Sequence, residues 1–509
     1  MPNNETTIVK TSGKVAFLSI VSSILNIPSK ILIAYFLQPV GYGYLGIANL
    51  MIRYSSYADL GVQLGMSRKI PQLLSKNKYD EANDILGITA FWMVIVTFLL
   101  SFFFISSYII GVDFRGLLDF KILLILLLLL IPHRLVKFFS NANKSYAEFR
   151  GIVAKYAFLA LSPILALIFA YYYNFTGVLI AELIIFSFIA FSSYYYFRKI
   201  EDINFKLVLS LSKAFSHLKN SFVLYKRSFL SNISQTFEIV LVPIFLSVSN
   251  LGLYFFAMTI NTPLRSFFGT INDIIERQML FEFSKTGSNS AFKKYFESNY
   301  AVFFFIVTLL LGLAFLFLKN IILFLLKSYE PAIEVSLILV IEATFLYMSF
   351  LSISYLNASG KLSLINNLFK INILSKLLLL NIFLLNNLEL VDFAIISLIG
   401  SFLIFSLSSF FSFKSIYGSS SSFYFMTFKI IILLMTFYLF LKNFNFSFFD
   451  SNTDYDLMYI TIYLIIDSIA ISLLYFFVVS ISCTVIFYSL RPDLRIVALL
   501  KKYTFVSRF

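Results

Sequence analysis

Long apolar runs separated by short polar stretches recur along the whole chain. Each run is about 20 residues long, which is the length that a helix needs to cross about 30 Å of hydrocarbon. No polar stretch between them is long enough for a soluble domain. The pattern predicts an all-α, polytopic membrane protein with fourteen transmembrane helices, at 15–37, 40–60, 85–110, 117–138, 152–172, 178–197, 228–248, 251–275, 300–318, 332–356, 362–385, 391–413, 423–441 and 457–490.

The composition agrees with this class. Apolar residues make up 59% of the 509 residues and charged residues 13%, whereas soluble proteins have about 45–50% and about 25%. One cysteine and two histidines are too few for a disulfide framework or a Cys/His metal cluster. Neither Ser-Gly-Lys segment has the other residues of a phosphate-binding loop, so we expect no ATP hydrolysis and no cofactor.

The distribution of Lys and Arg sets the expected topology. With the N-terminus inside, the segments that should face the cytoplasm hold most of the basic residues, as positive-inside orientation requires. Both termini are therefore predicted to be cytoplasmic. This distribution and attraction to anionic inner-leaflet lipid account for the net charge of +14, and a nucleic-acid partner is not needed.

A weak internal repeat divides the chain. FLQPVGYGYLGIA from Phe36 and FLSVSNLGLYFFA from Phe245 share Phe, Leu, Gly and Ala at one offset, and SNANK from Ser140 resembles LNASGK from Leu356. Two lobes of equal orientation are expected to enclose a central cavity. The predicted parts are an N-lobe at 1–200, a basic cytoplasmic linker at 201–227, a C-lobe at 228–415, two extra helices at 416–490 and a basic tail at 491–509.

Two stretches carry a family resemblance. FLQPVGYGYLGIANLMIRYSSYADLGVQLGMSRKIPQ and YLNASGKLSLINN, from Tyr355, resemble the polysaccharide-biosynthesis transporters, the O-antigen or Wzx-type flippases. The resemblance implies two six-helix lobes in a V shape, a fold shared with the multidrug/oligosaccharidyl-lipid/polysaccharide exporters. It also implies that an oligosaccharide linked to undecaprenyl diphosphate moves between leaflets of the bacterial inner membrane by alternating access, with polysaccharide polymerase machinery as a further partner. A count of fourteen spans differs from the twelve common among O-antigen flippases and is similar to that of the lipid II flippase. The exact substrate is therefore left open.

Two arginines are the first candidates for substrate binding. A diphosphate cannot cross hydrocarbon unless fixed cations replace its water. Arg53 lies within the predicted second span, and in the repeat register Arg265 falls opposite Ser56, one turn away. Asn49 and Ser56 share the helical face of Arg53, and Thr262 shares that of Arg265. Both polar faces are therefore expected to point into the cavity. A buried ion pair or snorkelling to the interface is the alternative.

Asp59 stands six residues after Arg53. Six residues turn a helix by about 600°, so Asp59 points about 120° away from Arg53 and cannot be its partner in the helix. We expect Asp59 to fix the local chain or to pair with a loop cation. A gate contact between the lobes is the alternative.

Other charged residues and prolines in the spans are further candidates. Lys30 extends the cationic path or snorkels, and Lys370 is a better cavity candidate than Lys376. Pro28 and Pro243 are bend points for a rocking motion or serve packing alone. The carboxylates that could neutralise these cations or titrate with an ion gradient are Glu182, Glu238, Glu334, Glu342 and Asp467.

Two other functional classes are open to test. A multidrug exporter of the same fold would favour carboxylates over arginines in its cavity, because it binds cationic compounds. A membrane polymerase would resemble chains with a large external catalytic loop, whereas the longest outer connection here, near 442–456, is short. We therefore expect a transporter and no enzyme.

Overall fold

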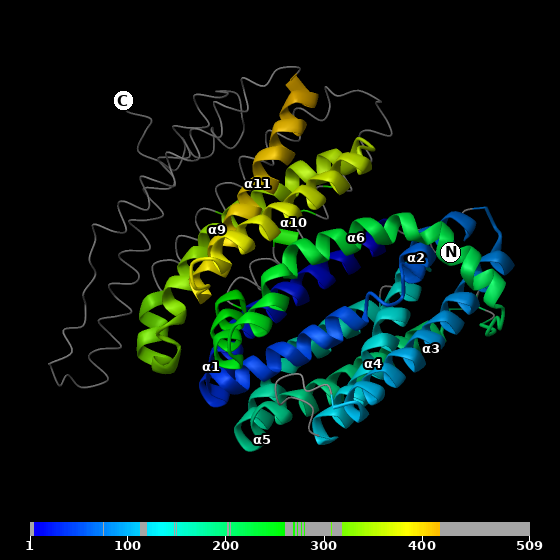
Figure 1. Ribbon diagram of the computed structural model, residues 1–509. Helices are drawn as coiled ribbons and strands as arrows, with labels where there is room; N and C mark the ends of the chain where they lie inside the picture. Colours follow the sequence, from blue (N-terminus) through cyan, green and yellow to red (C-terminus); the bar gives the residue numbers. More distant parts are fainter. Residues whose placement is uncertain are drawn as a thin grey trace, which may run out of the picture. The chain divides into compact units, whose positions relative to one another are not determined.

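The computed structural model describes residues 5–74, 76–111, 120–146, 150–200, 205–259 and 318–417, with 148, 203, 268, 269, 272, 276, 279 and 307 as single residues. Helices are the only regular elements in this part of the chain (Figure 1). They are α1 (Glu5–Ser55), α2 (Val62–Leu74), α3 (Tyr79–Ile109), α4 (Phe120–Ser145), α5 (Arg150–Phe197), α6 (Leu211–Phe245), the 3₁₀-helix η1 (Lys327–Tyr329), α9 (Ala332–Ala358), α10 (Leu362–Leu384) and α11 (Leu390–Tyr417).

Eight helices in the described part are long and apolar enough to cross a membrane. The prediction of an all-α, polytopic membrane protein is confirmed. The predicted spans at 423–441 and 457–490 lie outside the described residues, as does most of the span at 300–318. The count of fourteen therefore stays a prediction.

Two long helices each contain a single non-helical residue. In α1 it is Gln38 (φ 53°, ψ 171°), and in α5 it is Asn174 (φ 53°, ψ −141°). Pro39 disfavours helical geometry in the residue before it, and Asn tolerates positive φ better than most side chains. Both breaks fall where the sequence separates two spans, between 37 and 40 and between 172 and 178, so α1 and α5 each hold two predicted spans.

Two amphipathic segments lie beyond the predicted spans. Helix α2 was not expected, and α6 begins at Leu211, well before the predicted span at 228–248. Ser210 caps α6 by accepting a hydrogen bond from the Lys213 N–H at 3.3 Å. On α6, His217 and Ser221 are buried one turn apart, and a Cβ added to Gly65 of α2 would overlap the Ser221 hydroxyl. A search for continuous apolar runs misses such helices because only one face is apolar.

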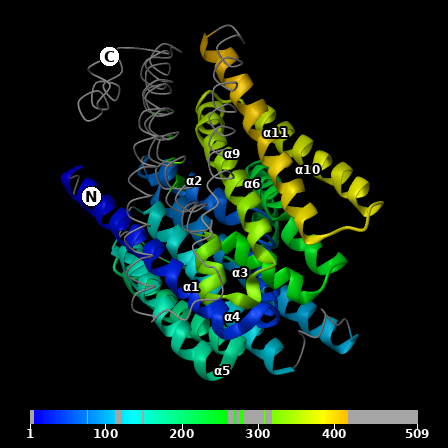
Figure 2. The same ribbon diagram turned by 90° about the vertical axis from the view of Figure 1, so that its left-hand side faces the viewer.

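The chain forms two compact units, one of residues 1–267 with 388–390 and one of 268–387 with 391–509. In the first unit, α1 packs chiefly against α5, and α5 against α4 (Figure 2). Helices α9, α10 and α11 lie in the second unit apart from the first residue of α11. Helix α6 belongs to the first unit, whereas the sequence places its span in a C-lobe that begins at 228. The division into lobes stays a prediction.

Two glycines of the first unit lie in close contact. A Cβ added to Gly43 would overlap the carbonyl oxygen of Val248, and a Cβ added to Gly252 would overlap the carbonyl oxygen of Pro39. The same sequence interval separates Pro39 from Val248 and Gly43 from Gly252, and it is the interval of the internal repeat. The contact between α1 and the helix Val248–Thr259 is therefore reciprocal, as at a two-fold axis.

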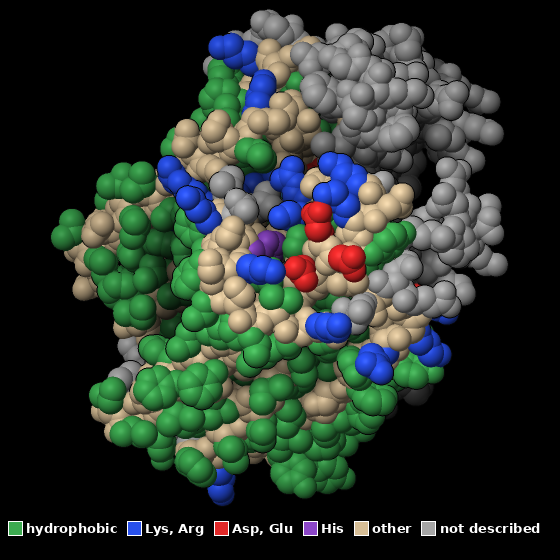
Figure 3. Space-filling view, turned by 90° about the vertical axis from the view of Figure 1, so that its right-hand side faces the viewer, with side chains coloured by type: hydrophobic (Ala, Val, Ile, Leu, Met, Phe, Trp, Pro, Cys, Tyr) green, Lys and Arg blue, Asp and Glu red, His purple; other side chains and the backbone are tan. Residues whose placement is uncertain are grey.

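The surface of the first unit is widely apolar. Phe98 of α3 is 71% exposed and Phe191 of α5 is 70% exposed, and such side chains face lipid in a membrane-spanning helix. Figure 3 shows a broad hydrophobic area on one face, with Lys and Arg side chains gathered beside it together with acidic side chains. This distribution is typical of a hydrocarbon-facing belt bordered by a charged interface.

Candidate functional site

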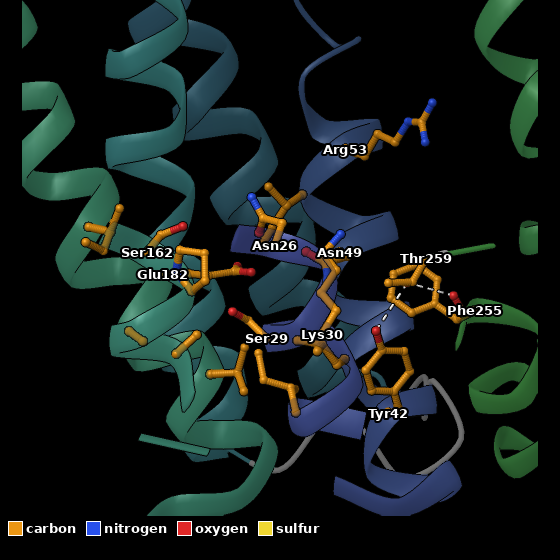
Figure 4. Close-up of a pocket in the computed structure, with 18 of the residues that line it drawn as sticks. Asn26, Ser29, Lys30, Tyr42, Asn49, Arg53, Ser162, Glu182, Phe255 and Thr259 are labelled. Atoms are coloured by element: carbon orange, nitrogen blue, oxygen red, sulfur yellow. Dashed lines mark hydrogen bonds between the residues drawn. The ribbon is translucent and has the colours of Figure 1, made fainter. Parts of the chain in front are cut away.

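A pocket of about 740 Å³ lies inside the first unit. Both halves of α1 and both halves of α5 line it, together with residues of α4, α6 and the helix Val248–Thr259 (Figure 4). Its charged or titratable lining residues, apart from Tyr42, are Lys30, Arg53, His133 and Glu182. Four of the residues predicted to bind substrate, Lys30, Asn49, Arg53 and Ser56, thus line one cavity.

Arg53 lies in the last turn of α1 and is held from α6. Its Nε donates a hydrogen bond to Asn232 Oδ1 at 3.1 Å, and Ser56 Oγ donates to the Arg53 carbonyl oxygen at 2.7 Å. Next to it, the hydroxyls of Tyr54 and Thr236 are hydrogen-bonded at 2.6 Å. In Figure 4 the guanidinium of Arg53 is directed away from the side of the pocket that holds Glu182.

Lys30 and Glu182 lie on α1 and α5 and line the same pocket (Figure 4). Their charges interact electrostatically. Among the described residues, however, the ion pairs do not include Lys30 with Glu182. The positive charge of Lys30 is therefore partly offset by the negative charge of Glu182. The sequence could not show this, because no helical periodicity relates residue 30 to residue 182.

His133 of α4 also lines the pocket, and sequence reasoning did not select it. Its ring stacks on Phe186 of α5, with 3.6 Å between centroids and 23° between planes. Its Nε2 is buried and has no hydrogen-bond partner among the residues that the structure describes. The available signal was a histidine inside a predicted span, next to Pro132.

Asp59 lies outside the pocket lining, in the buried turn between α1 and α2. Its carboxylate accepts hydrogen bonds from Arg134 Nη2, from Lys137 Nζ at 3.0 Å and from Gln63 Nε2 at 2.9 Å. Its carbonyl oxygen accepts from Trp92 Nε1 at 3.1 Å. Asp59 thus pairs with two cations of α4, neither of them in a loop.

The same two cations bind the end of α1. Arg134 Nη1 donates to the Ser55 carbonyl oxygen at 3.0 Å, and Lys137 Nζ donates to the Ser56 carbonyl oxygen at 2.5 Å. Positive charge at a helix C-terminus is favourable, since the last carbonyls have no partner within the helix. Gly61 (φ 84°) completes the turn, and a Cβ there would also press on Tyr225 at 2.6 Å.

Of the remaining predicted residues, those that the structure describes do not line this pocket. Lys370 of α10 is exposed and lies in the second unit, where Lys376 is buried with its side chain against Gly400. Pro28 lies within α1, and Pro243 lies near the end of α6. Arg265 and Thr262 lie outside the described residues. Among the residues described, no group of three or more His, Cys, Asp or Glu side chains could hold a metal ion.

Comparisons with known proteins give structural matches only. No protein-family model and no curated protein sequence matches the chain. The solved structure of the lipid II flippase MurJ, in an inward closed conformation, superposes with a TM-score of 0.66 at 16% identity, over 93% of this chain and 98% of that one. An inward-facing multidrug resistance MATE transporter of the MOP superfamily has a TM-score of 0.58 at 12% identity, over 79% and 94%.

A third solved structure is a MOP superfamily transporter from Pyrococcus furiosus Vc1, whose binding pocket is described as having reverse polarity. It has a TM-score of 0.55 at 12% identity and covers 80% of this chain and 95% of that one. Identities at this level show the fold alone. The chain is a multi-pass membrane protein with the fold of the MOP-superfamily transporters.

Proposed function

We propose that the protein is a flippase that moves a polyprenyl-diphosphate-linked oligosaccharide from the inner to the outer leaflet of the bacterial cytoplasmic membrane by alternating access. The observation that carries the proposal is the charge of the pocket in the first unit. Arg53 and Lys30 both line it, and Glu182 is the one carboxylate among its described lining residues. A pocket of net positive charge within membrane-spanning helices fits an anionic head group.

Arg53 has the central role in this proposal. A guanidinium can bind phosphate oxygens through two parallel hydrogen bonds, which an ammonium cannot. Asn232 fixes one edge of the guanidinium through Nε at 3.1 Å, and Asn49 and Ser56 supply neighbouring polar groups. Arg265, Thr262 and Lys370 remain proposed contributors, with bending at Pro28 and Pro243 during transport.

The class of substrate rests on two supports besides the charge. The motif resemblance is to O-antigen flippases, and the MurJ structure is named as a lipid II flippase. An O-antigen or capsule repeat unit is therefore proposed, with lipid II as the alternative. Anionic inner-leaflet lipid and polysaccharide polymerase machinery are proposed partners, and both termini are proposed to be cytoplasmic. We propose no catalytic activity.

A multidrug exporter is the second candidate, because MATE transporters share the fold. Glu182 is the observation in its favour, since a carboxylate in the pocket lining is what a cationic drug needs. Two cations in the same lining oppose it. The sign of the pocket therefore favours an anionic substrate.

The test is flipping by purified protein in proteoliposomes that contain an undecaprenyl-diphosphate-linked oligosaccharide. Arg53→Ala should reduce the flipping rate at least about 10-fold, because one charge-assisted phosphate contact contributes about 1.5–3 kcal/mol. Arg53→Lys should recover part of the rate. Lys78→Ala is the matched control, since Lys78 is an exposed cation paired with Glu81 outside the pocket. Unchanged flipping by Arg53→Ala at equal protein content would refute the proposal.

A further inference from the structure

Lys30 and Glu182 form a separated pair of opposite charges inside the pocket. Each lines the cavity, and each feels the charge of the other. No ion pair joins them within the described part of the chain. Two charges in a low-dielectric site would ordinarily close on each other, because their attraction grows as water is excluded. Because both side chains line the same cavity, a single ligand in it can contact both groups.

The walls beside this pair offer acceptors more than donors. Asn26 Nδ2 donates to the Ser22 carbonyl oxygen at 2.7 Å, which leaves Asn26 Oδ1 as an acceptor. The hydroxyls of Ser29 and Ser162 donate to carbonyl oxygens of their own helices, at 2.7 and 2.9 Å, and so present only lone pairs. In Figure 4 the labelled side chains Asn26, Ser29, Ser162 and Glu182 lie together on one side of the pocket. Arg53 lies on the other side and points away from them.

Such a wall discriminates between the two parts of the proposed substrate. Phosphate oxygens only accept hydrogen bonds, so Asn26 Oδ1 and the serine lone pairs offer them nothing, and the Glu182 carboxylate repels them. Sugar hydroxyls both donate and accept. They can donate to Glu182 and Asn26 Oδ1 while accepting from Lys30, which satisfies both charged groups.

We propose that the Lys30–Glu182 end of the pocket is a saccharide subsite, which binds the sugar next to the diphosphate while Arg53 binds the diphosphate itself. This inference rests on the proposed function. A pocket of about 740 Å³ lies within the range of about 300–1,000 Å³ that holds drug-sized ligands, so one sugar ring and a diphosphate fit together. The sequence left Lys30 open between extending the cationic path and snorkelling, and its place in one pocket with Glu182 favours the saccharide subsite.

The test compares the affinities of two lipids for the protein in nanodiscs, undecaprenyl diphosphate without sugar and the same lipid carrying a saccharide. The variant is Lys30→Met with Glu182→Met, which removes both charges and leaves neither unpaired. We expect binding of the saccharide lipid to weaken at least about 10-fold, since hydrogen bonds to two charged groups are lost. Binding of the bare lipid diphosphate should change less than about twofold. The matched control is Lys78→Met with Glu81→Met, an exposed pair of the same composition.

The outcomes separate this inference from the proposed function. Equal weakening for both lipids, or no weakening for either, would refute the saccharide subsite. Arg53→Ala should weaken both lipids alike. If wild-type protein binds neither lipid, the proposed function fails and the subsite fails with it. Suppose that wild-type protein binds both lipids and that Arg53→Ala weakens the binding of both. If the Lys30→Met, Glu182→Met variant then affects both lipids equally, the saccharide subsite alone is wrong.

Discussion

Two carboxylates of the first unit are satisfied in different ways. Asp59 is enclosed by Arg134, Lys137 and Gln63, so its charge is fully compensated by the protein. Glu182 lines a cavity, and among the described residues the charge that acts on it is that of Lys30. A compensated carboxylate stabilises a junction, whereas an incompletely compensated one is available to a ligand. The two residues are therefore expected to respond differently to substitution.

Substituting Asp59 should destabilise the protein. Asp59→Ala leaves Arg134 buried without its partner, which costs about 3–5 kcal/mol in comparable buried pairs. Thermal unfolding in detergent should show a lower midpoint, and adding Arg134→Met to the variant should recover part of the loss. A variant with normal stability but no flipping would contradict this and support the alternative gate role.

His217 should make stability depend on pH. Burial lowers the pKa of the His217 imidazole, the hydrogen bond with the Val62 carbonyl raises it, and the charge of Lys69 lowers it further, with a lowered pKa as the net result. The unfolded chain, with an ordinary pKa of about 6.5, takes up a proton first as pH falls. The stabilisation is therefore present above about pH 6.5 and is lost as pH falls below that value towards the folded-state pKa.

The measurement is the unfolding midpoint at pH 7.5 and pH 5.5 for wild type and His217→Gln. We expect the wild type to lose more between the two pH values, because the glutamine does not titrate. The other titratable groups contribute to both proteins alike and cancel in the comparison. Equal losses in the two proteins would show that His217 does not control the packing of α6 on α2.

At the scale of helices, tight glycine contacts carry the arrangement. Gly43 and Gly252 meet the carbonyl oxygens of Val248 and Pro39, and nearby the Tyr42 hydroxyl donates to Thr259 Oγ1 at 3.2 Å. A backbone this close to another backbone leaves no space for a side chain. Both substitutions at this contact should therefore act through the separation of the same two helices.

Gly43→Ala and Gly252→Ala should loosen the contact to a similar degree. The readout is labelling of Thr259→Cys by a thiol reagent, in a protein whose one natural cysteine, Cys483, is replaced by serine. Labelling should accelerate severalfold in both variants. Gly269→Ala is the control, because a Cβ at Gly269 would meet none of the described residues within 4 Å. Acceleration by one variant alone would argue against a reciprocal contact.

Much of the helix pattern was predictable, and the reason is physical. A membrane requires about 20 apolar residues per crossing, so runs such as 332–356 and 362–385 predict α9 and α10 to within a few residues. Helix α2 and the first turns of α6 were missed because they are amphipathic and lie beyond such runs. For the pocket, residues of α1 were predictable because they share a helical face. Glu182 was one of five candidate carboxylates with no predicted position, and His133 was not a candidate. Contacts between α1, α4 and α5 depend on tertiary packing, which the sequence pattern does not give.

For the whole molecule, the topology remains a prediction. Lys76, Lys213 and Lys294 are expected in the cytoplasm and Asn445 outside, although Lys294 and Asn445 lie beyond the described residues. Lys213 lies 3.4 Å from Asp84 in α3, so the start of α6 and the start of α3 should face the same compartment. Cysteines at 76 and 213 should react only with reagent supplied from the cytoplasmic side, and one at 172, beside the break at Asn174, only from outside. Labelling of position 213 from outside alone would overturn the topology.

The reciprocal contact of Gly43 with Gly252 is the geometry of a symmetric homodimer contained in one chain. In a dimer of identical halves, the same glycine would meet the same carbonyl of the other copy, and a single substitution would alter both sides at once. In this single chain the two glycines are separate positions, so each can be changed alone. Neither can gain a side chain without displacing the backbone opposite, so the one restriction of a homodimer becomes two independent restrictions here.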